Sequence, residues 1–325
     1  MNRKITLILC LILLTLSLSA CNTQNTKAEK EWQEKAFLLH SQGKYLEAAD
    51  AETKAIEINP KNPDNYINRG LALLNYYNSG SRAAADENFL QKGKQDIDKA
   101  LELAPENSES HRALGFYYTK YMNADKALAA LNKAIELNPR NAKAFKDRSI
   151  VYTNMGQSES ALQDINKAIN LQPQKAQYYI DRSGVFWLQK NKDASINDMQ
   201  KAISLEPENM DIHKRLAFIY TAFKDYPSAM DKVNQLMAKT PNDLDLYYLR
   251  SAIYLRLEQY DKAMNEAQKA LDIEPDNTQN LIQRGHVYYK MGEYEKAKAD
   301  LLKAMGGNPE DYEKNNTLEF FYKDS

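Results

Sequence analysis

Residues 142–173 read AKAFKDRSIVYTNMGQSESALQDINKAINLQP, and this copy of a repeated pattern ends at Pro173. Prolines in the equivalent place follow one another at one interval of 45 residues and then six intervals of 34: Pro60, Pro105, Pro139, Pro173, Pro207, Pro241, Pro275 and Pro309. A fixed period of this length is typical of a two-helix unit that must stack on its neighbours to bury its apolar face. The sequence therefore predicts an all-α superhelical solenoid of eight helix-turn-helix repeats over residues 29–309.

The register inside the repeat supports this prediction. With each proline at position 32, positions 8 and 20 carry only Ala, Gly or Ser, and position 27 is Ala in every copy but one, which has Leu236. Small residues let two helices cross closely, and a proline without an N–H ends the second helix. Gly93, at position 20 of the second repeat, is expected to weaken its helix by about 1 kcal/mol relative to Ala.

These residues resemble the tetratricopeptide repeat (TPR) family, and the resemblance covers residues 29–309. In that family the first helix of each repeat lines a concave groove, which implies that this chain binds a peptide or a partner protein there. The implied groove residues are Arg112, Phe116, Lys120, Lys146, Ile150, Trp187, Lys214, Phe218, Arg256, His286, Tyr289 and Lys290. Cations outnumber acids at the groove positions, which favours a partner with acidic groups and apolar anchors. Family members that clamp a terminal carboxylate carry Asn at position 9, and no repeat here does.

Position 7 is Arg in five repeats, and position 23 on the second helix is acidic in the same five. Because the planar guanidinium can hold a carboxylate by two contacts, we predict five structural ion pairs, each within one repeat. The predicted pairs are Arg69 with Asp96, Arg148 with Asp164, Arg182 with Asp198, Arg250 with Glu266, and Arg284 with Asp300.

The amino-terminal segment is expected to direct export. Asn2-Arg3-Lys4 precedes an apolar run from Ile5 to Ser17, too short for a membrane span but suited to a signal peptide. Leu18-Ser19-Ala20-Cys21 resembles the lipobox of bacterial lipoproteins, which implies cleavage after residue 20 and lipidation of Cys21 with fatty acids such as palmitate. Residues 21–28 are then a lipidated tether, and an ordinary secretory signal is the alternative.

Composition excludes several classes. Loss of Arg3 and Lys4 with the signal peptide leaves 41 basic and 44 acidic residues, a net charge of −3. A chain with this charge lacks the excess of basic residues that nucleic-acid-binding proteins carry. The four histidines lie in different repeats without cysteine companions, and no phosphate loop or nucleophile motif is present. We expect no metal, no cofactor and no enzymatic activity.

Two segments depart from the repeat. Eleven extra residues near 78–92 interrupt the second repeat. Their sequence predicts a turn followed by an early start of the second helix. The segment is either an insertion that the fold tolerates at its surface or a contact element for a partner. Residues 310–325 carry Leu318, Phe320 and Phe321, and they are expected to cap the last helix pair or to form a dimer contact.

Together these features predict a lipid-anchored scaffold or adaptor of the cell envelope, in the outer membrane facing the periplasm if the source is Gram-negative. Alternatives are a pilotin-like assembly or transport factor for an outer-membrane or pilus subunit, and a cell-wall glycan binder using faces such as Trp187 and Tyr289.

Overall fold

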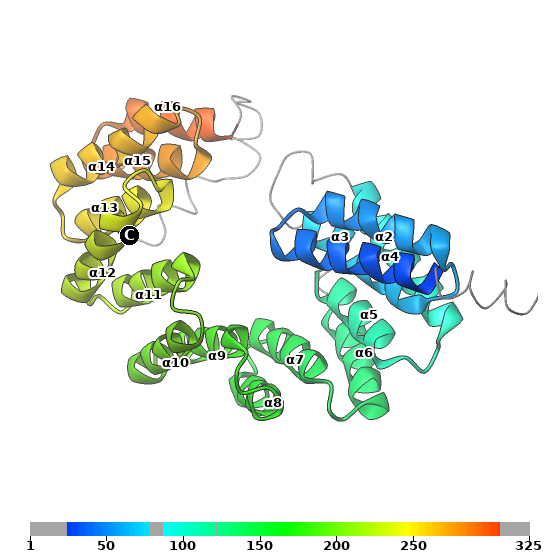
Figure 1. Ribbon diagram of the computed structural model, residues 1–325. Helices are drawn as coiled ribbons and strands as arrows, with labels where there is room; N and C mark the ends of the chain where they lie inside the picture. Colours follow the sequence, from blue (N-terminus) through cyan, green and yellow to red (C-terminus); the bar gives the residue numbers. More distant parts are fainter. Residues whose placement is uncertain (1–24, 78–86, 121–122, 306–325) are drawn as a thin grey trace, which may run out of the picture. The chain divides into compact units, whose positions relative to one another are not determined.

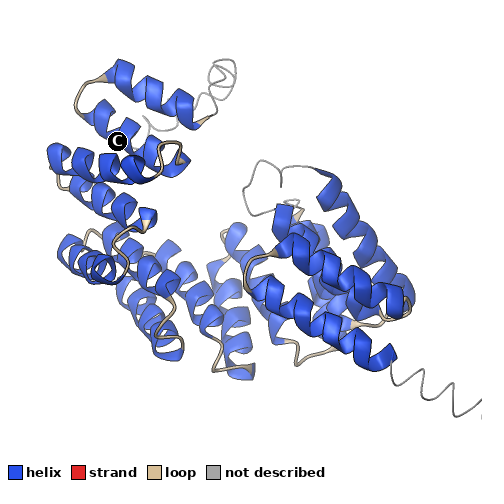
Figure 2. Ribbon diagram, turned by 45° about the horizontal axis from the view of Figure 1, so that its top comes forward, coloured by secondary structure: helices blue, strands red, loops and turns tan. Residues whose placement is uncertain are grey.

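A computed structural model describes residues 25–77, 87–120 and 123–305, and within these ranges all regular structure is helical (Figures 1 and 2). The chain divides into two compact units, Met1–Pro173 and Gln174–Ser325. The helices pair as the 34-residue period predicts, which confirms the all-α TPR fold. No helix among the described residues is long and apolar enough to cross a membrane.

In unit 1 the first helix spans residues 25–41. The others are α2 (Tyr45–Ile58), α3 (Pro63–Tyr77), α4 (Glu87–Leu103), α5 (Ser108–Lys120), α6 (Ala124–Leu137), α7 (Ala142–Asn154) and α8 (Ser158–Leu171). Consecutive helices of a repeat pack together, and first helices also contact first helices of the next repeat, as α3 does α5 and α5 does α7 (Figure 1).

Unit 2 continues the same alternation. Its helices are α9 (Ala176–Leu188), α10 (Lys192–Leu205), α11 (Met210–Ala222), α12 (Tyr226–Lys239), α13 (Leu244–Arg256), α14 (Tyr260–Ile273), α15 (Thr278–Lys290) and α16 (Tyr294–Ala304). Leu236, the exception at position 27, is buried beside Val233 in the core of α11, α12 and α13.

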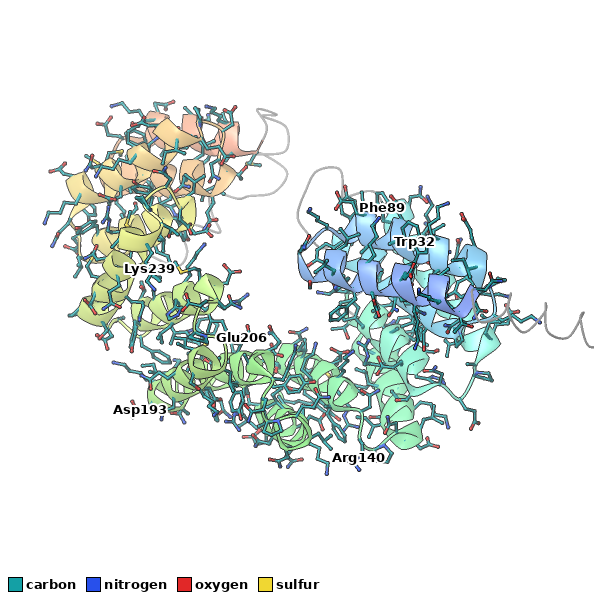
Figure 3. All side chains as sticks on the ribbon, in the orientation of Figure 1. Trp32, Phe89, Arg140, Asp193, Glu206 and Lys239 are labelled. Carbon is teal, nitrogen blue, oxygen red and sulfur yellow. The ribbon has the colours of Figure 1, made fainter. Side chains whose placement is uncertain are left out.

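Local chemistry explains where the helices end. In every repeat whose end is described, the proline at position 32 follows the last residue of the second helix by two places, as for Ile58 and Pro60. Asn or Asp often caps the next helix, and the Asn141 side chain accepts a hydrogen bond from the backbone N–H of Ala144 at 3.0 Å. Charged side chains such as Arg140 project from the helix ends and outer faces into solvent (Figure 3).

The small residues at positions 8 and 20 mark the helix crossings. In the second repeat, Gly70 of α3 and Gly93 of α4 approach so closely that a Cβ on Gly70 would lie 2.9 Å from the carbonyl oxygen of Gly93. A Cβ on Gly93 would lie 3.0 Å from the carbonyl oxygen of Gly70. Gly93 therefore makes the crossing possible, a role that outweighs the helix weakening expected from its propensity.

The turns within repeats need a left-handed residue at position 15. Gly156 has φ 73°, which glycine adopts without strain, whereas Lys224 occupies the equivalent turn of the sixth repeat with φ 61°.

Four segments predicted from the sequence lie wholly or partly outside the described residues. The signal peptide, Cys21 and residues 310–325 lie outside them. Residues 25–28, predicted as tether, are helical, and Glu29 in this first turn accepts hydrogen bonds from the amides of Asn59, Asn62 and Asn65. Of the inserted segment, residues 78–86 lie outside the described ranges; α4 has 17 residues where α6 and α8 have 14.

Candidate functional site

The five arginine–carboxylate pairs are present in the structure. Arg69, Arg148, Arg182 and Arg284 each contact both carboxylate oxygens of their acids, Asp96, Asp164, Asp198 and Asp300, at distances between 2.6 and 2.8 Å. Arg250 holds one oxygen of Glu266, with Nε at 2.9 Å from Oε2. The five carboxylates are nearly buried, between 5 and 6 % exposed. These pairs join the two helices of a repeat, so they belong to the framework that positions the candidate site.

A further contact of these arginines could not be read from the pairing pattern. The remaining Nη1 of Arg148 donates to Asn132 Oδ1 of the preceding repeat at 2.7 Å, and Arg284 reaches Gln268 in the same way at 2.6 Å. The arginine thus links three helices of two successive repeats. The signal was available at position 25, where these partners are polar.

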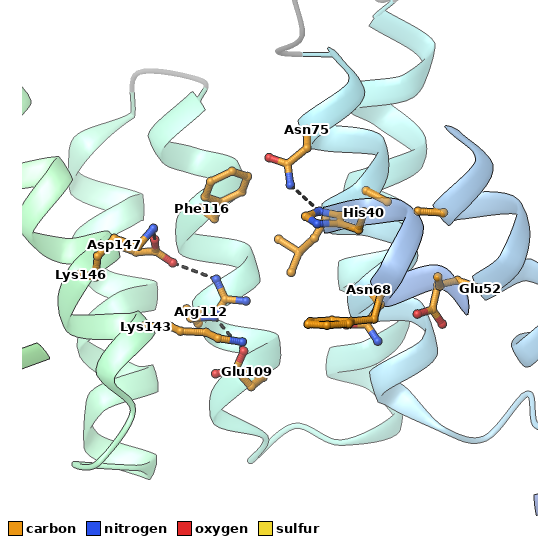
Figure 4. Close-up of a pocket in the computed structure, with 15 residues that line it drawn as sticks. His40, Glu52, Asn68, Asn75, Glu109, Arg112, Phe116, Lys143, Lys146 and Asp147 are labelled. Atoms are coloured by element: carbon orange, nitrogen blue, oxygen red, sulfur yellow. Dashed lines mark hydrogen bonds and ion pairs between the residues drawn. The ribbon is translucent and has the colours of Figure 1, made fainter. Parts of the chain in front are cut away.

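In unit 1, the first helices of the first four repeats and α2, the second helix of the first repeat, line a cavity of about 390 Å³. Of the predicted groove residues, Arg112, Phe116 and Lys146 line this cavity. Ile150 is half-buried and Lys120 is exposed, with the Lys120 ammonium 5.4 Å from the centre of the Phe116 ring. The cavity is therefore the part of the predicted groove that has depth in unit 1 (Figure 4).

Arg112 does not present its charge to solvent as the groove prediction implied. The residue is 8 % exposed, its Nε donates to Glu109 Oε2 at 2.8 Å, and its Nη1 donates to Asp147 Oδ2 at 2.9 Å. The Lys146 ammonium lies 2.6 Å from the other oxygen of Asp147. Burial alone would raise the pKa of Asp147, but the charges of Lys146 and Arg112 outweigh it, so the carboxyl stays ionised with a lowered pKa.

The opposite side of the cavity holds residues that were not predicted. Asn75 donates to Nε2 of His40 at 2.9 Å, a contact that requires a neutral ring. Burial, and then the charge of Lys143, lower the pKa of His40. Phe37, on the same helix as His40, is 77 % exposed at the rim. Lys143 lies on α7 with Lys146, on the other side of the cavity, and is exposed.

Glu52 of α2 is the unusual residue of this cavity. It is 2 % exposed, and its Oε2 has no hydrogen-bond partner among the described residues. Burial raises its pKa to about 8, although the amide of Asn68 and the charge of Arg69 act in the other direction. The cavity therefore contains one ionised buried carboxyl, Asp147, and one that is protonated at neutral pH, Glu52.

The repeat pattern itself marks Glu52. It occupies position 24, and the other seven repeats place an apolar residue there, buried in each case: Ile97, Leu131, Ile165, Met199, Val233, Ala267 and Leu301. A carboxyl at a core position has a desolvation cost that packing does not recover. Comparing the repeats position by position would have found this residue, whereas patterns of charged pairs did not.

In unit 2 the predicted groove residues differ in their exposure to solvent. Trp187 and Phe218 are 38 % and 49 % exposed, with ring centres 6.2 Å apart. Lys214 is held by Asp243 and Asp245, each at 2.8 Å. The remaining members divide by exposure: Arg256 and Lys290 are exposed, and His286 and Tyr289 are half-buried.

The described residues contain no group of three or more His, Cys, Asp or Glu side chains arranged to hold a metal ion. The cavity of unit 1 combines amides, cations and apolar rims, which suits binding of a polar group next to an apolar anchor.

Comparison with known proteins agrees with the fold. Tetratricopeptide repeat family profiles match residues 187–253 and 130–163, and the profile described as anaphase-promoting complex, cyclosome, subunit 3 matches residues 222–304. No curated protein sequence matches the chain. Together with the helix pairing, the profile matches support a TPR protein, a class that generally serves as a non-enzymatic scaffold for protein–protein interaction.

Several solved structures share this fold at low sequence identity. A TPR protein of Thermus thermophilus is 18 % identical with a TM-score of 0.52, covering 60 % of this chain and 100 % of its own. A chain of the APC/C Cut9–Hcn1 complex is 18 % identical in sequence, with a TM-score of 0.61, and the match covers 85 % of this chain and 52 % of that chain. PilW, described as a type IV pilus biogenesis factor, is 17 % identical in sequence, with a TM-score of 0.53. That match covers 67 % of this chain and 96 % of PilW.

Proposed function

We propose that this protein is a lipid-anchored interaction scaffold or adaptor of the cell envelope, which captures a peptide or an exposed segment of a partner protein. The observation that carries the proposal is the cavity of unit 1. It is lined by charged, amide and apolar side chains, and Phe37 stands exposed at its rim. A partner segment with an apolar anchor beside a polar group matches this combination.

The location rests on the sequence. An apolar run ending in Leu18-Ser19-Ala20-Cys21 supports cleavage before Cys21 and acylation of its thiol. Two or more fatty acyl chains hold a protein stably at a bilayer. Mass spectrometry of the mature amino terminus tests this part: Cys21 with attached acyl chains supports it, and an unmodified terminus refutes it.

Photocrosslinking from the cavity tests the interaction. A crosslinking residue at Phe37 is compared with one at Glu206, which is exposed in unit 2 far along the sequence. We expect a discrete adduct from Phe37 that is absent from Glu206, with the captured protein identified by mass spectrometry. Equal adducts from both positions, or none from Phe37, would contradict a binding role for the cavity.

A pilotin-like assembly factor is a second candidate, because PilW shares the fold and covers two thirds of this chain. It predicts transient capture of a newly exported client, whereas an adaptor co-purifies stably with a folded partner. A third candidate, a cell-wall glycan binder, rests on the exposed Trp187 and Phe218 rings of unit 2. Binding to purified cell wall that is lost in Trp187→Ala would favour it.

A further inference from the structure

The carboxyl of Glu52 lies at repeat position 24, a position that points into the apolar core in the other repeats. Every other repeat fills position 24 with a buried aliphatic, Met or Ala side chain. Replacing that side chain by a carboxyl removes apolar packing and adds a polar group with an unsatisfied oxygen, and each change costs free energy. Such a residue is explained if a ligand completes its hydrogen bonding.

The surroundings of Glu52 indicate which ligand fits. The charged and titratable groups that face it or share its cavity are Glu29 and His40 of the first helix, Asp64 and Arg69 of α3, Glu109 and Arg112 of α5, and Lys143, Lys146 and Asp147 of α7. Arg112 and Lys146 are matched by Glu109 and Asp147. Arg69 is matched by Asp96. Glu29, Asp64 and Arg69 lie outside the cavity lining. Among the residues that line it, the cations Arg112, Lys146 and Lys143 face the carboxylates of Glu109 and Asp147, so Lys143 is the lining cation without a matching acid.

Two amides complete the lining. Asn68 and Asn75 of α3 both lie at the cavity wall. Figure 4 shows Glu52 and Asn68 on one side of the cavity, with Lys143 and Lys146 on the other. The Asn75 amide already donates to His40, and the Asn68 amide interacts with Glu52. A protonated carboxyl and an ammonium both donate hydrogen bonds, and the positive charge of the ammonium favours an anionic acceptor.

We propose that the Glu52 cavity is a carboxylate-binding site, in which the acid of Glu52 donates its proton in a hydrogen bond to an acidic group of the partner while Lys143 supplies the counter-charge. This inference rests on the proposed function and names the chemistry of the captured segment. It differs from a clamp built of Lys and Asn on first helices, because its central donor is a carboxylic acid on a second helix.

The site is consequently sensitive to pH. The pKa of Glu52 is raised to about 8, so the donor is present at neutral pH and is replaced by a negative charge as the pH rises through that value. If only the protonated cavity accepts a carboxylate, the apparent affinity is about tenfold weaker at about pH 9 than at about pH 7.

The test uses the full-length chain and three short acetylated peptides without groups that titrate in this range. One carries a glutamate side chain and an amidated end, one replaces that glutamate by glutamine, and one has alanine with a free terminal carboxylate. Binding is followed through the side-chain amide NMR signals of Asn68 and Asn75. The first and third peptides distinguish a side-chain carboxylate from a chain terminus.

We expect at least one carboxylate peptide to bind more tightly than the glutamine peptide and to lose about tenfold in affinity between about pH 7 and pH 9. Glu52→Gln keeps an N–H donor without a titrating charge, so its binding is retained and independent of pH. Glu52→Leu, which restores the apolar residue of the other repeats, keeps the fold but loses binding. Glu47→Gln, an exposed glutamate on the same helix, behaves like the unaltered protein.

Three results overturn the inference. These are affinity that does not change with pH in the unaltered protein, affinity that rises with pH, and no binding of either carboxylate peptide at millimolar concentration. A crosslinked partner captured from Phe37 alongside any of these would leave the proposed interaction function standing. Absence of a Phe37 adduct together with pH-dependent peptide binding would support the carboxylate site and contradict the proposed interaction function.

Discussion

The pair between Arg148 and Asp164 allows a quantitative test of what holds a repeat together. Nε and Nη2 of Arg148 donate to the two oxygens of Asp164 at 2.6 and 2.7 Å, and Nη1 donates to Asn132 of the preceding repeat. The Asp164 side chain is 8 % exposed, and the Arg148 side chain is 19 % exposed. Removing the arginine therefore leaves a nearly buried carboxylate with little access to water.

We expect Arg148→Met to destabilise unit 1 by about 3 kcal/mol, the lower end of the range for breaking a buried ion pair, because the arginine side reaches solvent. Methionine retains the apolar stem, so the loss reports mainly on the charge. Asp164→Asn is expected to cost about 1–2 kcal/mol, since the stranded guanidinium is partly hydrated. The double variant should recover about 1.5 kcal/mol as coupling energy.

Because a repeat array can unfold in parts, the free energy is best measured by hydrogen exchange of the amides in α7 and α8, supported by urea unfolding. Arg140→Met, at an exposed arginine, is the matched control and should change little. Coupling should persist at about 1 M salt, since a buried pair is screened weakly. Additive single effects, or coupling that vanishes with salt, would refute the assignment of a buried structural pair.

Three further predictions concern the same framework. The pKa of Glu52 is higher in the folded than in the unfolded state, so the folded protein holds this proton more tightly and the free energy of unfolding falls as pH rises from about 4.5 to about 8. The loss amounts to on the order of 4 kcal/mol at about pH 8. Urea unfolding over this pH range should show that Glu52→Gln removes the dependence. Gly93→Ala should destabilise the crossing with Gly70 by about 1–3 kcal/mol despite its better helix propensity, and equal or greater thermal stability would contradict the close approach. Lys224→Gly should stabilise unit 2 by up to about 1 kcal/mol because the left-handed turn then carries no strained side chain, whereas a loss in calorimetry would show that the lysine contacts matter more.

Much of the fold could be predicted because a repeat presents the same rule several times. One proline after each second helix, and small residues at two crossing positions, define a helix pair without knowledge of its neighbours. The match between Arg at position 7 and an acid at position 23 indicated which side chains to pair. By contrast, Arg112 was expected at the partner surface, and only its contacts with Glu109 and Asp147 place it inside.

The site depended on information that a local pattern does not contain. Glu52 and Lys143 lie on different helices of different repeats, and the sequence does not state how deep the space between those helices is. Burial sets the ionisation of Glu52, and burial is a property of everything packed around a group. The sequence alone determined the helices, their pairing and their ion pairs, because those follow from short-range periodicity. Only the tertiary structure decided which polar groups share a cavity, because desolvation and long-range proximity arise when separate repeats stack.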